Sequence, residues 1–197
     1  MANSELIQEF LKNKRFTHRN FRGTVLSTSV TDKSGWMAGS TGDRLYLTVI
    51  PYTACLKSIK VGLNVDWDNL EYKVGIAGIN LDALDDESIS LFTDIKTDLI
   101  TVAESAATPD VGEMVDIDTL EGPTFESVPM SMQSKTIYQQ LCDANGNPIE
   151  AFEPYKNANY GVLFFEILAA NTNSGDMHVN IEWTEKTPAE SPLVIPA

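Results

Sequence analysis

The chain has 197 residues, 43% of them hydrophobic, which is enough for one substantial domain with a buried core. Its 28 acidic and 14 basic residues give a net charge of −14, which disfavours non-specific attraction to nucleic acid or to an anionic membrane surface. The two cysteines, Cys55 and Cys142, are too few for a disulfide framework and lie in no metal-binding spacing. We expect both to be small, buried hydrophobic residues of a protein made in a cytoplasm.

The first 22 residues differ from the rest of the chain in charge. They hold five basic and two acidic residues, a net +3, so the remaining residues carry −17. Within them, the stretch NSELIQEFLKNKRF predicts an amphipathic helix with Asn3 or Ser4 as its N-cap. Its apolar residues recur at helical spacing: Leu6, Ile7, Phe10 and Leu11. We therefore treat residues 1–22 as a basic amphipathic arm that docks on its own domain or on a neighbouring subunit.

Alternating hydrophobicity predicts four strands in the next part of the chain, at about 24–30, 44–50, 56–67 and 70–77. In the second of them, Leu45, Leu47 and Val49 fall on one face. Pro51 cannot donate to a β-ladder, so we expect residues 50–54 to form a corner between two strands of a sandwich. The dipeptide Asp68-Asn69 predicts a tight turn, and hence a β-hairpin that joins the third strand to the fourth.

The segment from about 80 to 132 is acidic and thin in apolar residues. Between residues 82 and 126, Lys96 is the only base, and prolines interrupt the segment. This composition predicts long surface loops, with short strands or a short helix at DDESISLF, rather than a second core.

Regular alternation returns near the C-terminal end of the sequence. YGVLFFEILAA, residues 160–170, predicts a strand that is covered on both faces and interrupted by Glu166. MHVNIEWT then places Met177, Val179, Ile181 and Trp183 inside. Residues 186–197 hold three prolines and predict an extended tail.

With seven or eight strands and almost no helix, we expect an all-β fold: an antiparallel, jelly-roll-like β-sandwich over residues 23–185, preceded by the short N-terminal helical arm.

No residue pattern predicts catalysis, a metal site or a cofactor. The two histidines, His18 and His178, are accompanied by no nucleophile motif. The acidic run around Asp82 lacks the residue order of an EF-hand, and Asn145-Gly146 in DANGNPIE predicts a hairpin turn rather than a calcium loop. Of the tryptophans, only Trp36 has the setting of a loop aromatic, whereas Trp67 and Trp183 are in phase with core positions.

Two long segments resemble a layout found in virion proteins of tailed bacteriophages. The first is STGDRLYLTVIPYTACLKSIKVGLNVDWDNLEYKVGIAG, in which Gly-Asp enters a strand that ends at an apolar-Pro turn. The second runs from KTIYQQLC through a polar turn to YGVLFFEILAANTNSGDMHVNIEW, where the resemblance implies a closing hairpin. The similarity covers roughly residues 40–78 and 135–183 and rests on layout, without invariant functional residues.

The resemblance implies a capsid decoration or cement protein with a jelly-roll-like sandwich. Such a protein would bind the major capsid protein on the outer surface of a phage capsid and bridge neighbouring coat subunits. We expect it to be a homo-oligomer located in the virion, with no enzymatic activity and no nucleic-acid or membrane partner. The acidic middle, the basic arm and the proline-rich tail depart from the layout and leave a vertex, portal collar or tail location open.

The basic arm supplies the candidate residues for capsid binding, because a positive segment with interleaved aromatic side chains suits an acidic coat surface. The alternative is an arm that folds back on the acidic loops of its own chain. The candidate residues are Lys12, Lys14, Arg15, Phe16, Arg19, Phe21 and Arg22.

Two other classes of protein stay open. A carbohydrate-binding or receptor-binding sandwich of a virion would take a glycan on an exposed aromatic platform around Trp36 or Tyr52. A self-assembling jelly-roll coat protein would form shells alone, although the acidic body suits poorly a surface that faces the phosphates of a genome.

Overall fold

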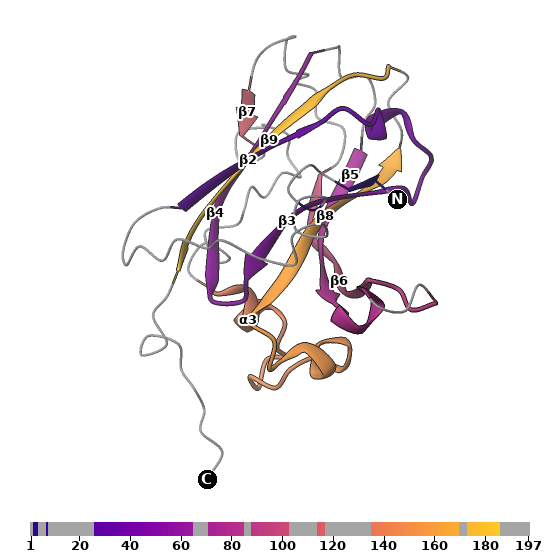
Figure 1. The fold of residues 1–197 in the computed structure, drawn as a ribbon. Coiled ribbons are helices and arrows are strands. Elements are labelled where there is room, and N and C mark those ends of the chain that lie inside the picture. The colour runs from indigo at the N-terminus through magenta and orange to yellow at the C-terminus, as the bar shows by residue number, and fades with distance from the viewer. Residues whose placement is uncertain are drawn as a thin grey trace.

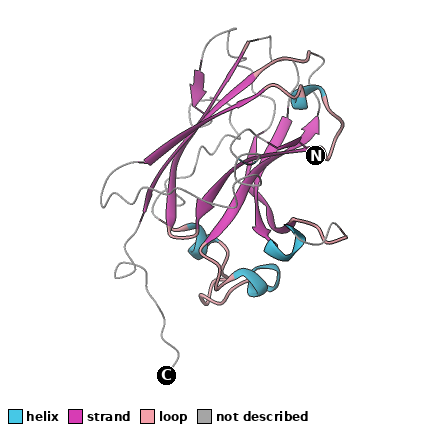
Figure 2. Cartoon of the chain, viewed as in Figure 1, coloured by secondary structure: helices cyan, strands magenta, loops and turns pink. Residues whose placement is uncertain are grey.

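The computed structural model describes residues 2–3, 7, 26–64, 71–84, 88–102, 114–116, 135–169 and 173–185. Within these residues, two β-sheets face each other across one hydrophobic core. The four-stranded sheet lies on the left of Figure 1 and the five-stranded sheet on the right. The helical segments are short and lie in connections outside both sheets (Figure 2). No described helix is long and apolar enough to cross a membrane.

The strand order of each sheet follows from its hydrogen-bonded pairs. The five-stranded sheet has the order β1 (Ala2–Asn3), β3 (Arg44–Pro51), β8 (Tyr160–Ala169), β5 (Glu71–Ile79) and β6 (Phe92–Val102). The four-stranded sheet has the order β2 (Leu26–Asp32), β9 (Met177–Glu185), β4 (Ala54–Leu63) and β7 (Met114–Asp116). Only the short pair of β1 with β3 is parallel among the described pairs.

Strands β2 to β9 form a jelly roll. They divide into two sheets of four, β2-β9-β4-β7 and β3-β8-β5-β6, and every neighbouring pair among them is antiparallel. Along the chain, each connection from β2 onwards crosses to the other sheet except the one between β5 and β6. Eight strands in this double Greek-key order define the jelly-roll topology, so the expected fold class is confirmed.

The corner predicted at Pro51 is also confirmed. Strand β3 ends at Pro51, which pairs with Tyr160 in the five-stranded sheet, and β4 begins at Ala54 in the other sheet. Proline can end the ladder of one sheet because no further backbone donor is needed there. The backbone N–H of Tyr52 instead donates to Asn159 O at 3.0 Å.

Two of the predicted hairpins, the one at Asp68-Asn69 and the closing one, are wrong. Strand β4 pairs with β7 and β9, whereas β5 pairs with β6 and β8, so the two strands on either side of Asp68-Asn69 lie in different sheets. Likewise β8 and β9, the strands of the supposed closing hairpin, belong to different sheets. The reason is that alternation shows which face of a strand is buried, and this signal is the same for strands that meet side by side and for strands that meet face to face across a core.

Two β-bulges shift the buried face within a strand. In β3, Tyr46 pairs with Phe164 and Thr48 with Leu163, which leaves Leu47 as an extra residue. Val49 therefore lies outside the main core, contrary to the predicted face, while Ile50 lies inside it. A similar register shift at Lys57 in β4 explains why Leu56 and Ile59, at odd spacing, both face the core.

Strand β6 is longer than the acidic composition predicted. It has 11 residues and buries Ile95, Leu99 and Ile100 in the core, so the expectation of short strands only is wrong for this part of the chain. Irregular pairing between β5 and β6 breaks the period-two pattern, which is why the strand was not recognised. Most of residues 103–134 lie outside the described part of the chain.

The connection before β8 packs over one end of the sandwich. Helix α3 (Ile137–Gln140) begins at a capping box formed by Thr136 and Gln139, and the 3-10 helix η3 (Glu150–Tyr155) follows it. Ile137, Leu141 and Phe152 of this connection are fully buried in the core. Phe152 lies edge-on against Tyr52, with the ring centroids 5.0 Å apart. This connection therefore closes the core at the end where the corner of Pro51 lies.

The turn predicted at Asn145-Gly146 is confirmed. Gly146 has a φ of 84°, which favours glycine, and the N–H groups of Asn145 and Asn147 donate to Asp143 Oδ1 at 2.8 and 2.9 Å. These bonds lower the pKa of Asp143, with the bond from Asn147 as the largest cause. The carboxylate thus holds a turn together, as an Asx-type motif does.

Replacing Gly75 tests the packing of the five-stranded sheet. A Cβ atom at Gly75 would lie 2.3 Å from Cζ of the fully buried Phe164, so Gly75→Ala must displace that ring. We expect a loss of about 1–3 kcal/mol of unfolding free energy, as in other overpacked sites. Denaturant unfolding measures it, with Ser29→Ala on an exposed position of β2 as a control that changes stability by less than about 0.5 kcal/mol. Equal stability of Gly75→Ala and the wild type would contradict this packing.

Candidate functional site

The outer face of the five-stranded sheet carries a second hydrophobic cluster, separate from the main core. We call it the outer cluster; its buried members are Ile7, Tyr46, Val49, Ala77, Val162 and Phe164. Partly buried Ile79, Phe92 and Tyr160 pack against it. Its members come from β3, β5 and β8 and from the N-terminal segment, so residues far apart in the sequence meet on this one face.

Aromatic contacts hold the outer cluster together. The ring of Tyr46 lies 4.3 Å from that of Phe92 and 5.7 Å from that of Phe164, measured between centroids. Phe164 can lie close to the sheet because its neighbour across the pair of strands β5 and β8 is Gly75, which has no side chain. Over these rings Ile7, a helical residue of the N-terminal segment, is fully buried. Ile7 therefore covers part of a face that would otherwise be more exposed.

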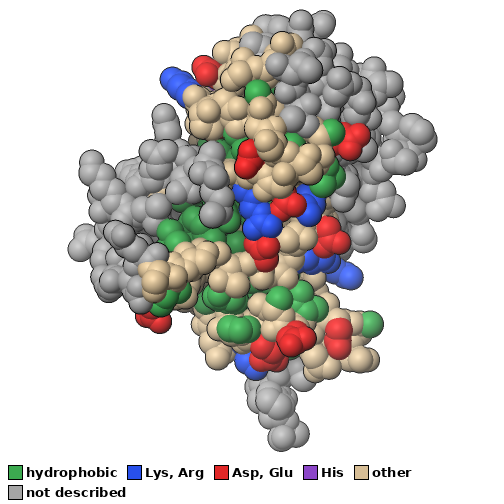
Figure 3. Space-filling view, turned by 90° about the vertical axis from the view of Figure 1, so that its right-hand side faces the viewer, with side chains coloured by type: hydrophobic (Ala, Val, Ile, Leu, Met, Phe, Trp, Pro, Cys, Tyr) green, Lys and Arg blue, Asp and Glu red, His purple; other side chains and the backbone are tan. Residues whose placement is uncertain are grey.

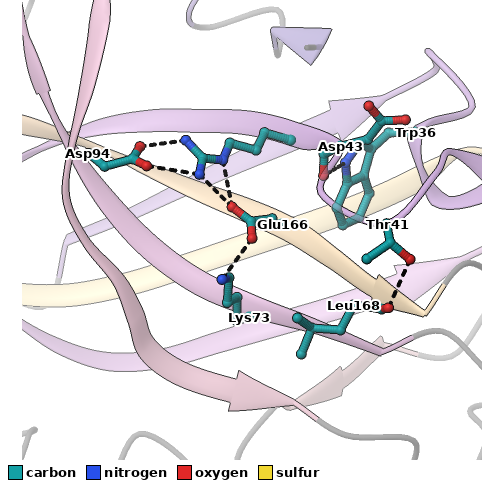
Figure 4. Close-up of polar contacts among 8 residues, drawn as sticks. Trp36, Thr41, Asp43, Lys73, Asp94, Glu166 and Leu168 are labelled. Atoms are coloured by element: carbon teal, nitrogen blue, oxygen red, sulfur yellow. Dashed lines mark hydrogen bonds and ion pairs between the residues drawn. The ribbon is translucent and has the colours of Figure 1, made fainter.

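A charge network borders the outer cluster. Three of its residues, Arg44, Glu166 and Lys73, lie side by side on β3, β8 and β5 in direct register. Arg44 Nε donates to Glu166 Oε2 at 2.6 Å, and Lys73 Nζ lies 2.7 Å from Glu166 Oε1. The guanidinium group of Arg44 also makes a bidentate pair with Asp94 of β6 (Figure 4). The network thus joins the four antiparallel strands of this sheet.

The network also contacts the outer cluster directly. The guanidinium carbon of Arg44 lies 4.7 Å from the centroid of the Phe164 ring, within the range of a cation–π interaction. In the space-filling view, basic and acidic side chains gather in the middle of this face, next to hydrophobic side chains (Figure 3). An apolar centre with charged neighbours is the usual composition of a protein interface.

The pKa shifts of Arg44 and Glu166 indicate that both side chains of the network are charged at neutral pH. Burial alone would raise the pKa of Glu166, but hydrogen bonds from Lys73 and Arg44 outweigh it and hold the pKa below its ordinary value. Burial lowers the pKa of Arg44, but its hydrogen bonds to Asp94, Tyr46 and Glu166 outweigh burial and hold the pKa above its ordinary value. Burial raises the pKa of Tyr46. At neutral pH Glu166 is therefore ionised and accepts hydrogen bonds from the two cationic side chains.

The candidate capsid-binding residues Lys12, Lys14, Arg15, Phe16, Arg19, Phe21 and Arg22 lie outside the described residues, as does His18. From the predicted N-terminal helix, the structure describes Asn3 and Ile7. Asn3 belongs to strand β1 and Ile7 is helical, while the residues between them, where the predicted helix would begin, lie outside the described part of the chain. Residues 186–197, the predicted tail, also lie outside the described part.

The structure contradicts an aromatic platform at Trp36 or Tyr52. Trp36 begins the 3-10 helix η1 (Trp36–Ala38) and is only 5% exposed, packed against Tyr72 and Phe165 of the core. Its indole N–H donates to Asp43 O at 3.0 Å. Tyr52 is 3% exposed. The glycine-flanked setting of Trp36 predicted a loop aromatic, but the helical turn directs its ring into the sandwich.

The cysteines and His178 form no reactive or metal-binding arrangement within the described residues. Cys55 is buried as expected, while Cys142 is partly exposed, contrary to the expectation, and neither forms a disulfide. His178 faces outward on β9, with Nδ1 3.1 Å from the hydroxyl oxygen of Thr31. Within the described ranges, no three or more His, Cys, Asp or Glu side chains are grouped so as to hold a metal ion.

Sequence reasoning did not find the charge network, although one signal was present. Glu166 interrupts a strand that was predicted to be covered on both faces, and a charge at such a position needs a partner. The identity of that partner depended on strand order. Arg44 and Lys73 flank Glu166 only because β8 lies between β3 and β5.

The fold defines the described part of the chain as an eight-stranded jelly roll with an additional N-terminal strand. Its structure is similar to the capsid of Ralstonia phage GP4, with a TM-score of 0.47 and 12% sequence identity over 91% of this chain and 96% of that one. A likeness at this level carries no argument about function. No protein-family model and no curated protein matches the sequence.

Removing the charge of Glu166 tests the network. At neutral pH we expect Glu166→Gln to lower the unfolding free energy by about 1–2 kcal/mol, because it leaves Arg44 and Lys73 without their shared, largely buried partner. A carboxylate with a lowered folded-state pKa stabilises the fold above its unfolded-state pKa, near 4.5, and that contribution is lost as the pH falls through the folded-state pKa. The difference between wild type and variant should therefore shrink below about pH 4.5.

The matched control is Glu153→Gln. Glu153 pairs with Lys156 at 2.7 Å, but both side chains are well exposed, so this change should cost far less stability. Urea unfolding of both variants between pH 3 and pH 7 makes the comparison. A pH-independent cost of Glu166→Gln would show that its effect comes from packing rather than charge.

Proposed function

We propose that this chain is a non-enzymatic structural protein of a tailed-phage particle, a decoration or cement protein that binds the outer surface of the capsid and bridges coat subunits. The observation that carries the proposal is the complete jelly roll, an architecture common in viral capsid proteins. The two segments that resemble phage virion proteins contain β3, β4, β5, β8 and β9, so the resemblance falls on strands of both sheets.

Charge supports the outer surface as the location. The strongly acidic body favours solubility and resists unwanted association, and it is poorly suited to a surface that contacts nucleic acid. The basic arm of residues 1–22 offers the opposite charge for contact with an acidic region of the major capsid protein. A bridging protein needs no reaction, only buried area and charge complementarity distributed over several partners.

The carbohydrate-binding alternative loses its main support. Jelly rolls also occur in lectins, but sugar stacking needs an exposed ring, and both Trp36 and Tyr52 are buried. A self-assembling coat protein remains the structural alternative. It would form shells from the purified chain alone, whereas a decoration protein needs shells made of another chain.

Quantitative mass spectrometry of purified virus particles tests the proposal first. A decoration protein should be present in a copy number approaching that of the major capsid protein. A handful of copies per particle would place the chain at a vertex or tail and contradict shell decoration, and its absence from particles would reject a virion role altogether. Electron microscopy of the purified chain distinguishes a self-assembling coat protein from a decoration protein, because only the coat protein would form shells by itself.

Charge reversal in the arm tests the attachment. We expect the triple variant Lys14→Glu, Arg15→Glu and Arg19→Glu to bind undecorated capsids at least about tenfold more weakly at 0.1 M salt, since each exposed pair contributes up to about 1 kcal/mol. Wild-type binding should weaken as salt rises, and the variant should depend less on salt.

The control for this variant makes the same change of net charge elsewhere. Lys33, Lys96 and Lys135 lie on the described body, so their replacement by glutamate changes the overall charge equally without touching the arm. If both triple variants lose the same affinity, the effect comes from net charge and the arm is not the anchor. If the arm variant retains full occupancy, the assignment of the seven arm residues is wrong.

A further inference from the structure

We infer that Asn145 is a site of spontaneous covalent modification, at which the backbone nitrogen of Gly146 attacks the side-chain amide and converts asparagine into aspartate and isoaspartate. The turn that contains both residues restrains this reaction, and Asp143 is the residue that holds the turn closed. The inference does not rest on the proposed function, because the reaction needs only this chain and water.

Asn145 combines two features that this reaction needs, a glycine as the next residue and access to solvent. Asn145-Gly146 is the one Asn-Gly pair in the sequence, and both residues are exposed. A Cβ atom built at Gly146 would meet nothing within 4 Å, so the space beside this residue is open to water. Because glycine has no side chain, its nitrogen can approach the preceding side chain with less steric hindrance than that of other residues.

The reaction balances with water as its co-reactant. The nitrogen of Gly146 loses its proton and forms a bond to Cγ of Asn145, the Cγ–Nδ2 bond breaks, and the amide nitrogen leaves with a proton as ammonia. Water then opens the resulting five-membered imide at one of its two carbonyl carbons. Opening at Cγ gives aspartate, whereas opening at the backbone carbonyl carbon gives isoaspartate, in which the main chain runs through the former side chain.

The folded turn engages both reacting groups in other bonds. The nucleophile, the backbone nitrogen of Gly146, donates to Asp143 O at 3.0 Å. The carboxylate of Asp143 accepts from the backbone N–H groups of Asn145 and Asn147, and hydrogen bonds from the side chains of both asparagines also lower its pKa. Asn145 therefore reacts when the turn opens, so the rate follows the population of the open turn.

A second exposed asparagine provides a matched control within the same chain. Asn157 precedes Ala158, whose backbone nitrogen donates to Tyr155 O at 2.9 Å. The nitrogen that would attack thus makes a comparable turn hydrogen bond at both sites. The two sites differ in the residue that follows the asparagine, which is alanine here and glycine in the other turn.

The modification changes the connection that closes one end of the core. It adds a negative charge next to Asp143, and isoaspartate also lengthens the main chain inside the turn by one methylene group. Asp143 N donates to Asn147 O at 2.7 Å, and Ile149 N donates to Leu141 O at 2.9 Å, so both bonds depend on the length of chain between their partners. Leu141 is fully buried, and the effect of the turn therefore reaches the core.

Peptide mapping of the aged, full-length chain tests the site. Purified protein is incubated for weeks in buffers of increasing pH, digested briefly in acidic buffer and analysed by mass spectrometry that separates aspartate from isoaspartate. We expect both products to accumulate at Asn145 several times faster than at Asn157, with a rate that rises with pH because the attacking nitrogen must lose a proton. Asn147 should stay unchanged, since Pro148 has no N–H that could form the imide. Equal rates at Asn145 and Asn157, or aspartate without isoaspartate, would overturn the site.

Asp143→Ala tests the restraint in the same assay. The variant removes the acceptor of two backbone N–H groups, so we expect modification of Asn145 to become at least about threefold faster, with no change at Asn157. Asp143→Ser keeps a hydroxyl oxygen that can accept from the backbone, and it should give an intermediate rate. An unchanged rate at Asn145 would overturn the restraining role of Asp143. An equal rise at Asn145 and Asn157 would do the same, because it would assign the effect to general unfolding.

Discussion

Strand β8 is covered on both faces, and the rest of the structure depends on how this is achieved. On one face, Leu163, Phe165 and Ile167 fill the core between the sheets. On the other, Val162 and Phe164 form the centre of the outer cluster. Glu166 follows on that same outer face, where a nearly buried carboxylate is tolerable only with cationic partners, and Arg44 and Lys73 supply them from the two neighbouring strands. Alternation along β8 thus decides which of its side chains face outward, and the neighbouring strands supply their partners.

The sequence was most informative where a single strand could be read alone. Alternation identified strand β5 and the buried face of β9, and Pro51 marked the corner between β3 and β4. Pairing could not be predicted in this way, because the jelly roll places consecutive strands in opposite sheets. The two wrong hairpins arose from this limit. The bulge at Leu47 set a second limit on prediction, since one extra residue moves every later side chain of a strand to the other face.

The candidate site was less predictable than the fold for the same reason. Composition indicated a basic arm and an acidic body, but the outer cluster combines Ile7 with residues of β3, β5 and β8. Such a surface exists only after the strand order is fixed. The sequence did contain one local sign of it, a glutamate inside an otherwise apolar strand. Trp36 shows the opposite case, because an aromatic residue flanked by glycines lies in the core here rather than on an exposed loop.

The strand order also has a consequence for the order in which the molecule can form during synthesis. Strand β2 pairs with β9 alone among the described strands, and β4 has β9 as its longest partner. An inner strand of each sheet, β8 in one and β9 in the other, is thus among the last of the described strands to leave the ribosome. Until then the apolar faces of β2, β3 and β4 lack the strands that should lie between or beside them. Such a chain folds through contacts between residues distant in sequence, which slows folding and leaves apolar strand faces exposed in the nascent form.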